Sequence, residues 1–82
     1  MKKDKRLQKI KNNPYNVDFK EAIQLLKDFG FNLERIKGSH HIFRHPLTRH
    51  KVNLQRDRSG KAKPYQIKQI LKIIQKIQEG GD

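Results

Sequence analysis

Residues 31–44 read FNLERIKGSHHIFR, and this stretch decides the fold. Side chains alternate along residues 31–36, and residues 40–44 have the pattern of a returning strand. Because successive side chains of a strand point to opposite faces, the pattern predicts two strands. Gly38-Ser39 lies between them and predicts a tight hairpin turn.

Two longer amphipathic segments flank the strands. Apolar residues recur at helical spacing over residues 19–29 and again over residues 67–77, which predicts two helices. Asn16 or Asp18 is expected to cap the first of these helices through a side-chain oxygen. Gly30 is placed to turn the chain out of it.

A third alternating segment, residues 51–55, predicts a third strand, and residues 3–12 predict a short N-terminal helix. The sequence therefore predicts an α+β fold, a two-layer sandwich with a three-stranded antiparallel sheet and two helices on one face. The other face of the sheet would be open and polar. Residues 1–13 are interpreted as a basic N-terminal extension or short helix, and residues 14–79 as a single domain.

The chain is short and strongly basic. Its 82 residues include 20 Lys and Arg against 8 Asp and Glu, a net charge of +12. A chain of this size buries only about 60% of its unfolded surface, so one domain with a thin core is expected. Large catalytic architectures are excluded by length. The absence of cysteine excludes disulfides, thiolate zinc sites and a cysteine nucleophile.

The positive charge comes from both ends of the chain. Residues 1–13 carry a net +5 and residues 38–82 a net +7, whereas residues 14–37 are neutral. Such a field attracts polyanions, and nucleic acid is the favoured partner. A membrane partner is not expected, because no apolar run approaches the roughly 20 residues of a bilayer span. The N-terminus has no apolar segment typical of a secretory signal, so a cytoplasmic location is predicted.

All four histidines fall within eleven residues: His40, His41, His45 and His50. They can be ordinary polar residues of the strands and the turn. A metal site is the second interpretation, but stable zinc sites need three or four converging ligands. The nearest acids, Glu34 and Asp57, stand at no recognised ligand spacing, and we predict no metal and no cofactor.

Acid–base chemistry on RNA is the third interpretation. Imidazole titrates near neutral pH and can take and return a proton without a cofactor. RNA supplies its own nucleophile in the 2′-OH. His40 shares a strand face with Ile42 and Arg44, whereas His41 shares the other with Phe43. Alternation does not decide which histidine points outward, but one of the two should face the core or an edge.

Two motifs resemble a known family. Phe29-Gly30-Phe31, followed by Lys37-Gly38-Ser39-His40-His41-Ile42-Phe43-Arg44-His45-Pro46, looks like the signature of the HicA family. HicA proteins are toxins of bacterial type II toxin–antitoxin systems. The resemblance extends from about residue 13 to residue 77. It implies a double-stranded-RNA-binding-like fold, which agrees with the sandwich predicted above.

The resemblance also implies an activity and a partner. It implies a metal-independent endoribonuclease that cleaves mRNA, with its essential histidine directly after Gly-Ser. That position is His40 here, and His41 beside it is the second catalytic candidate. The family's frequent Val-Pro-x-His segment is replaced by Val52-Asn53-Leu54-Gln55, which leaves no second histidine on that strand. A cognate acidic HicB-like antitoxin is the implied protein partner.

Basic and polar residues around these motifs are the candidate RNA contacts: Lys37, Ser39, Arg44, Arg49, Lys61 and Lys63. Lys61 and Lys63 precede the last helix, whose first N–H groups are suited to phosphate. A non-catalytic RNA-binding module of the same fold is the alternative function, with the histidines as bystanders. A weaker alternative is a structural protein whose basic surface binds an acidic partner.

Overall fold

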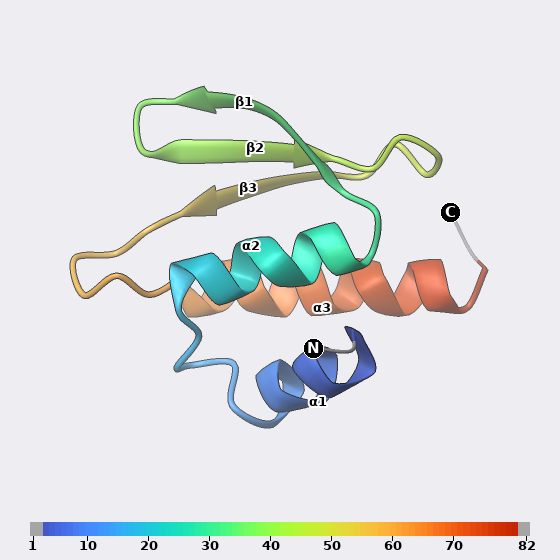
Figure 1. Ribbon diagram of the computed structural model, residues 1–82, viewed down its shortest axis with the longest axis horizontal. Coiled ribbons are helices and arrows are strands. Elements are labelled where there is room, and N and C mark those ends of the chain that lie inside the picture. Colours follow the sequence, from blue (N-terminus) through green and yellow to red (C-terminus); the bar gives the residue numbers. More distant parts are fainter. Residues whose placement is uncertain (1–2, 81–82) are drawn as a thin grey trace.

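The computed structural model describes residues 3–80 and shows an α+β fold (Figure 1). Its elements in chain order are α1 Lys3–Asn12, α2 Phe19–Asp28, β1 Asn32–Lys37, β2 His40–Arg44, β3 Lys51–Gln55 and α3 Pro64–Gln78. The strands form one antiparallel sheet in the order β1-β2-β3. Helices α2 and α3 cover one face of this sheet, and α1 lies beyond them, away from the sheet. The predicted sandwich and its short N-terminal helix are confirmed. None of the helices in this part of the chain has the length and apolar character needed to cross a membrane.

The core forms where the helices meet β2 and β3. Phe43 of β2 lies opposite Val52 of β3, and both side chains are buried with Leu54. Alternation brings these side chains to one face, and the apolar stripes of α2 and α3 pack on them. Each fully buried side chain of this size contributes about 1.5–3 kcal/mol by leaving water. Phe43, Val52 and Leu54 face the helices, so the intervening residues, Ile42 among them, point to the other side of the sheet.

Strand β1 has the predicted alternation but no buried face. All six of its residues are exposed, and Leu33 and Ile36 keep 44% and 56% of their surface accessible. It is the edge strand that lies farthest from the helices in Figure 1. A break in the register between Leu33 and Arg35 interrupts its pairing with β2.

Helix α1 is packed onto the domain. Leu7 and Ile10 on one side of it are buried in the same core as the residues of α2 and α3. An ion pair between Arg6 and Asp28 and another between Lys9 and Glu21 join it to α2. The N-terminal segment is therefore part of the fold over the described residues.

The predicted cap of α2 differs from the observed one. Asp18 stands at the N-cap, but its side chain makes no capping hydrogen bond. Its carboxylate instead accepts a hydrogen bond from Lys61 Nζ at 2.8 Å, across 43 residues of sequence. The Asp18 carboxylate thus forms a long-range ion pair in place of the local cap.

Gly30 lies where α2 passes into β1, in contact with the end of β2. Its φ of +89° is in the region that side chains rarely adopt. A Cβ added at Gly30 would lie 3.0 Å from Nε2 of the buried His45 ring. Glycine is therefore required here twice, for its backbone conformation and for the space that the imidazole fills.

We predict that Gly30→Ala destabilises the domain more than a matched substitution does. Gly60 has nearly the same backbone angle, φ +86°, but a Cβ added there would meet nothing within 4 Å. The left-handed backbone alone costs an alanine about 1–2 kcal/mol, and overpacking typically adds at least about 1 kcal/mol. Urea denaturation of Gly30→Ala and Gly60→Ala should show the larger loss for Gly30→Ala. Equal losses would mean that the ring of His45 does not restrict this position.

Candidate functional site

His40 begins β2 directly after the hairpin turn, on the face of the sheet that the helices leave uncovered. We call this the open face. Lys37 of β1 and Gln55 of β3 lie opposite His40 in the two ladders. Directly opposed side chains share a face and come within a few ångströms of one another. Lys37, His40 and Gln55 therefore form a row across the open face at the hairpin end.

Asn53 orients the His40 ring. Its Oδ1 lies 3.1 Å from His40 Nδ1, one pleat away on the same face. An amide oxygen only accepts hydrogen bonds, so this contact in a neutral ring requires the proton on Nδ1 and places the lone pair on Nε2. Gln55 in turn donates a hydrogen bond to the hydroxyl of Ser39 at 3.4 Å. Strand β3 thus holds both the histidine and the turn that precedes it.

His41 points to the opposite side of the sheet. Its ring meets the Phe19 ring of α2 edge-on, with 4.9 Å between the centroids. The Arg56 guanidinium lies 5.4 Å from the centroid of the same Phe19 ring. His41 Nδ1 is buried and has no hydrogen-bond partner among residues 3–80. One of the two adjacent histidines faces the helices, as alternation requires, and the two imidazoles lie on opposite faces of the sheet.

The other two histidines belong to the turn between β2 and β3. His45 is buried, and its Nδ1 accepts hydrogen bonds from the backbone N–H groups of Leu47 and Thr48 at 3.2 and 3.1 Å. His50 Nδ1 lies 2.8 Å from the Thr48 hydroxyl. Within residues 3–80, no three His, Asp or Glu side chains gather where they could hold a metal ion. The four histidines thus divide into one on the open face, one in the layer of the helices and two in a turn.

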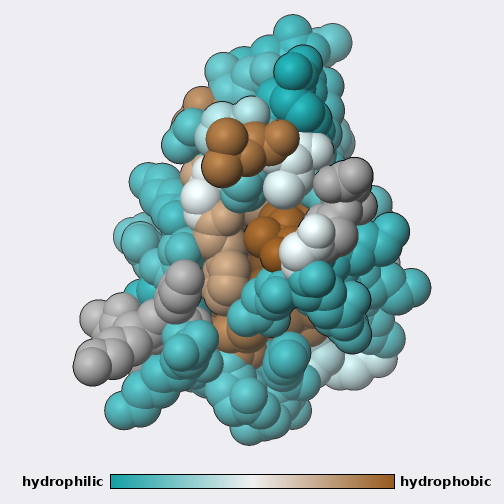
Figure 2. Space-filling view, turned by 90° about the vertical axis from the view of Figure 1, so that its right-hand side faces the viewer, coloured by the Kyte–Doolittle hydropathy of each residue, from teal (hydrophilic) through white to brown (hydrophobic). Residues whose placement is uncertain are grey.

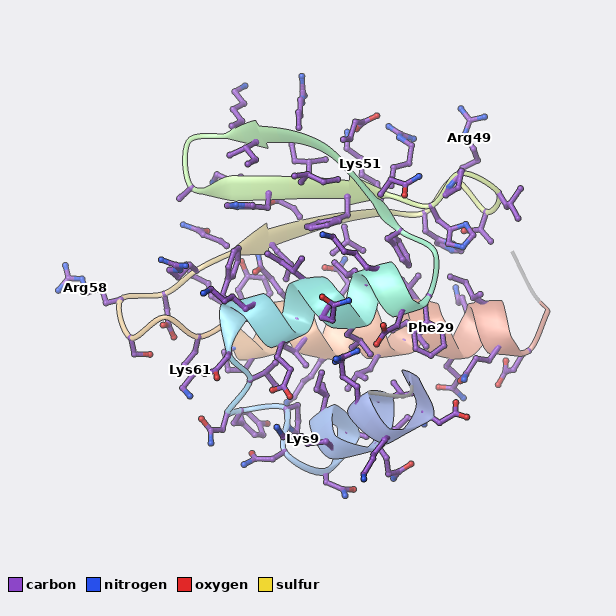
Figure 3. The ribbon with its side chains drawn as sticks, in the orientation of Figure 1. Lys9, Phe29, Arg49, Lys51, Arg58 and Lys61 are labelled. Carbon is purple, nitrogen blue, oxygen red and sulfur yellow. The ribbon has the colours of Figure 1, made fainter. Side chains whose placement is uncertain are left out.

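Basic side chains gather at the hairpin end. The loop between β3 and α3 lies at the same end of the molecule as the β1–β2 hairpin in Figure 1, nearer to the helices, and Arg58 and Lys61 extend from it in Figure 3. Asp57 organises this loop by accepting hydrogen bonds from the hydroxyl and N–H of Ser59 and from the Lys61 N–H. These bonds hold the pKa of Asp57 below its usual value. The Lys61 ammonium likewise lowers the pKa of Asp18, to which it donates a hydrogen bond.

Two residues predicted to contact RNA lie at the other end of the sheet. Arg44 is four residues from His40 along β2, a distance of about 13 Å. It donates a hydrogen bond to Glu34 at 3.0 Å, which holds the pKa of that carboxyl below its usual value. Arg49 lies in the turn beyond β2 (Figure 3), at the end where Figure 2 shows apolar surface surrounded by hydrophilic residues. The structure thus brings Lys37 and Ser39 to His40 and separates Arg44 and Arg49 from it.

Sequence reasoning did not identify the residues that position His40. Asn53 and Gln55 alternate with buried Val52 and Leu54, so their place on the polar face was predictable. Their pairing with His40 was not, because it depends on the register of β2 and β3. Gln66 was also missed: it is buried, and its side-chain oxygen accepts the Gln55 N–H at 2.8 Å. This bond joins the first turn of α3 to the end of β3.

Comparison with known protein families gives one match. The family model described as the HicA toxin of bacterial toxin-antitoxin matches residues 19–75, well over half of the chain. The matched range begins at the first residue of α2, contains all three strands and ends within α3. Comparisons with curated proteins and with solved structures give no match.

The hydrogen bonds predict different tautomers for His40 and His45. At a pH where both rings are neutral, His40 should carry its proton on Nδ1, since that atom donates to Asn53. His45 should carry its proton on Nε2, because its Nδ1 accepts two backbone N–H groups. Long-range ¹H–¹⁵N NMR correlations distinguish the two forms. An Nε2–H tautomer at His40 would contradict the role assigned to Asn53.

Proposed function

The chain belongs to the HicA family of toxins from bacterial toxin–antitoxin systems, and on this premise we propose that it is an endoribonuclease that cleaves mRNA without a metal ion. His40 is the general base in this proposal. The observation that carries it is the contact of His40 Nδ1 with Asn53 Oδ1 at 3.1 Å, which in a neutral ring assigns Nε2 as the atom that accepts a proton. No protein nucleophile is needed, because the 2′-OH of RNA lies next to the phosphate that it attacks.

The reaction is an internal transfer within the RNA. His40 Nε2 takes the proton of a 2′-OH, and the 2′-oxygen forms a bond to the adjacent phosphorus. The bond from phosphorus to the 5′-oxygen breaks, and that oxygen takes a proton from water. The products are a 2′,3′-cyclic phosphate and a 5′-hydroxyl end. Lys37, directly opposite His40, places a positive charge beside the phosphate as its negative charge grows.

The open face supplies charge for neighbouring phosphates. Arg35, Lys37, Arg44 and Lys51 occupy the same face as His40, and Glu34 pairs with Arg44. An RNA backbone that follows β2 from His40 reaches Arg44 after about 13 Å. In this proposal Arg44 and Arg49 bind flanking phosphates and take no part at the cleaved one. Lys61 and Lys63 bind phosphates of the RNA on the other side of His40, where the RNA passes the loop before α3.

The same face suits a cognate antitoxin. HicA toxins are paired with an antitoxin, and an acidic HicB-like partner is complementary to a chain of net charge +12. By covering the row of Lys37, His40 and Gln55, such a partner would exclude the phosphate and the water that the reaction needs. Inhibition would then follow from blocked access to His40, with no change in the fold of the toxin.

One observation favours a second candidate function, an RNA-binding module without cleavage. Gln55 stands opposite His40, where the resembled pattern has a histidine, and an amide side chain cannot transfer a proton in this way. Of the two adjacent imidazoles, only His40 lies on the open face. Binding of RNA that is independent of His40, with no cleavage at any pH, would establish this alternative.

We predict that purified protein cleaves a long RNA in the presence of EDTA and that His40→Ala lowers the rate by about 10²- to 10⁴-fold. His41→Phe is the matched control, because it keeps an aromatic ring against Phe19 and removes the second imidazole. It should cleave at close to the wild-type rate. Circular dichroism of both variants shows whether they are folded. A folded His40→Ala variant with unchanged activity would exclude His40 as the base, and an inactive folded His41→Phe would show that the reaction needs the second imidazole.

Asn53 is predicted to act as a positioning residue through His40. Loss of one hydrogen bond, worth about 1 kcal/mol, corresponds to roughly a fivefold lower rate for Asn53→Ala. Asn53→Asp keeps the accepting oxygen and should retain most of the activity. Its added negative charge favours imidazolium, so the acidic limb of its pH–rate profile should move to higher pH. Identical pH profiles for wild type and Asn53→Asp would show that Asn53 does not act through the ring.

A further inference from the structure

The aromatic residues of the chain divide into a buried and an exposed set. All four phenylalanines are at least nine-tenths buried, whereas Tyr15 and Tyr65 each keep 64% of their surface accessible. The chain contains only these two tyrosines and no tryptophan. Neither tyrosine belongs to the core cluster, so the packing of the domain does not explain the rings.

Lys68 contacts one of the exposed rings and lines a hollow with the other. Lys68 Nζ lies 4.6 Å from the centroid of the Tyr15 ring and donates a hydrogen bond to its hydroxyl. Lys68 also lines a shallow hollow of about 510 Å³ together with Tyr65, Gln69 and Lys72. These four residues follow one face of α3, since positions three, four and seven apart lie above one another on a helix. We call Tyr15, Tyr65, Lys68 and Lys72 the tyrosine patch.

The patch combines the two features that bind unpaired nucleotides. Successive bases of a single strand stack on aromatic rings, and cationic side chains follow the phosphates. Exposed tyrosines also occur at protein interfaces, and the net charge of +12 together with the proposed function directs the choice to RNA. Bases of a duplex are stacked on one another and are not free to meet a ring. The chemistry of the patch therefore fits single-stranded RNA best.

The patch adjoins the basic end of the molecule that carries His40. Tyr65 is the second residue of α3, after Lys63 and Pro64, and α3 begins at the end of the molecule where the β1–β2 hairpin also lies in Figure 1. Arg58 and Lys61 extend from the loop between β3 and α3 (Figure 3). Arg58 adds positive charge at the tip of the loop, whereas the Lys61 ammonium is paired with Asp18.

We propose that the tyrosine patch binds unpaired bases of the RNA strand that is cleaved at His40. This inference rests on the proposed function for the identity of the strand. It assigns the exposed face of α3 as a second contact with the substrate, at the opposite side of the loop from the hairpin. The patch thereby selects single-stranded RNA.

The two tyrosines make the patch directly observable. With no tryptophan in the chain, the intrinsic fluorescence of the protein comes from Tyr15 and Tyr65 alone. The probe is a 2′-O-methyl RNA oligonucleotide of mixed sequence, which lacks the nucleophile and is not cleaved. Titration with the single strand should quench the tyrosine emission, and titration with the matching duplex should leave most of it unchanged.

Substitutions separate stacking from charge. Tyr65→Leu should weaken binding of a labelled single strand by about tenfold, the effect of one lost stacked base. Lys68→Gln should weaken binding and reduce the slope of affinity against salt by about 1. Lys76→Gln is the matched control, because Lys76 is an exposed lysine of the same helix outside the hollow. It should bind the strand like the wild type.

The outcomes distinguish the patch from the catalytic proposal. One outcome is that the wild type cleaves RNA, the single strand does not quench the tyrosine emission, and Tyr65→Leu binds the single strand with wild-type affinity. The proposal for the tyrosine patch is then overturned, and the ribonuclease proposal stands. Equal quenching by polyglutamate would overturn the patch proposal too, because charge alone would then explain binding. Quenching by the single strand together with weakened Tyr65→Leu binding supports the patch even if no cleavage occurs. The absence of cleavage would overturn only the catalytic proposal.

Discussion

The ring of His45 occupies the space that a side chain at residue 30 would fill, and this contact joins the segment after α2 to the end of β2. Gly30 ends α2 and leads into β1, whereas His45 follows the last residue of β2. The same ring packs edge-on against Phe31 and accepts two N–H groups of the turn that leads to β3. One buried imidazole therefore fixes the exit of α2, the end of β2 and the turn after it. The Phe-Gly-Phe and His-Pro motifs are far apart in sequence but form this one contact.

The position of His40 follows from that arrangement. Once the end of β2 is fixed, alternation along the strand sends Phe43 and His41 toward the helices and His40 toward the open face. The turn after β2 sets the register with β3, and this register brings Asn53 to the His40 ring. His45 thus has a role in the fold, and His40, five residues away, is the base of the proposed reaction.

Local patterns were sufficient to predict the elements, and long-range contacts were not predictable from them. The Gly-Ser turn, the strand alternation and the apolar stripes are local, and they place all three strands and both long helices. Asp18 shows the limit, because its partner Lys61 is 43 residues away and replaces the local cap. Arg44 and Arg49 are near His40 in sequence, but an extended strand separates them from it. Asn53 was missed because its contact with His40 depends on a register that a single sequence does not specify.

In the proposed mechanism, His40 Nε2 activates a 2′-OH of the RNA itself. The most direct test uses a short RNA in EDTA, with the cleaved position first located and then replaced by a single 2′-deoxynucleotide. We expect a 2′,3′-cyclic phosphate and a 5′-hydroxyl from the unmodified RNA, and no cleavage at the deoxy position. Cleavage at that position, or products that carry a 5′-phosphate, would show that water or a protein group attacks the phosphorus and would contradict the mechanism.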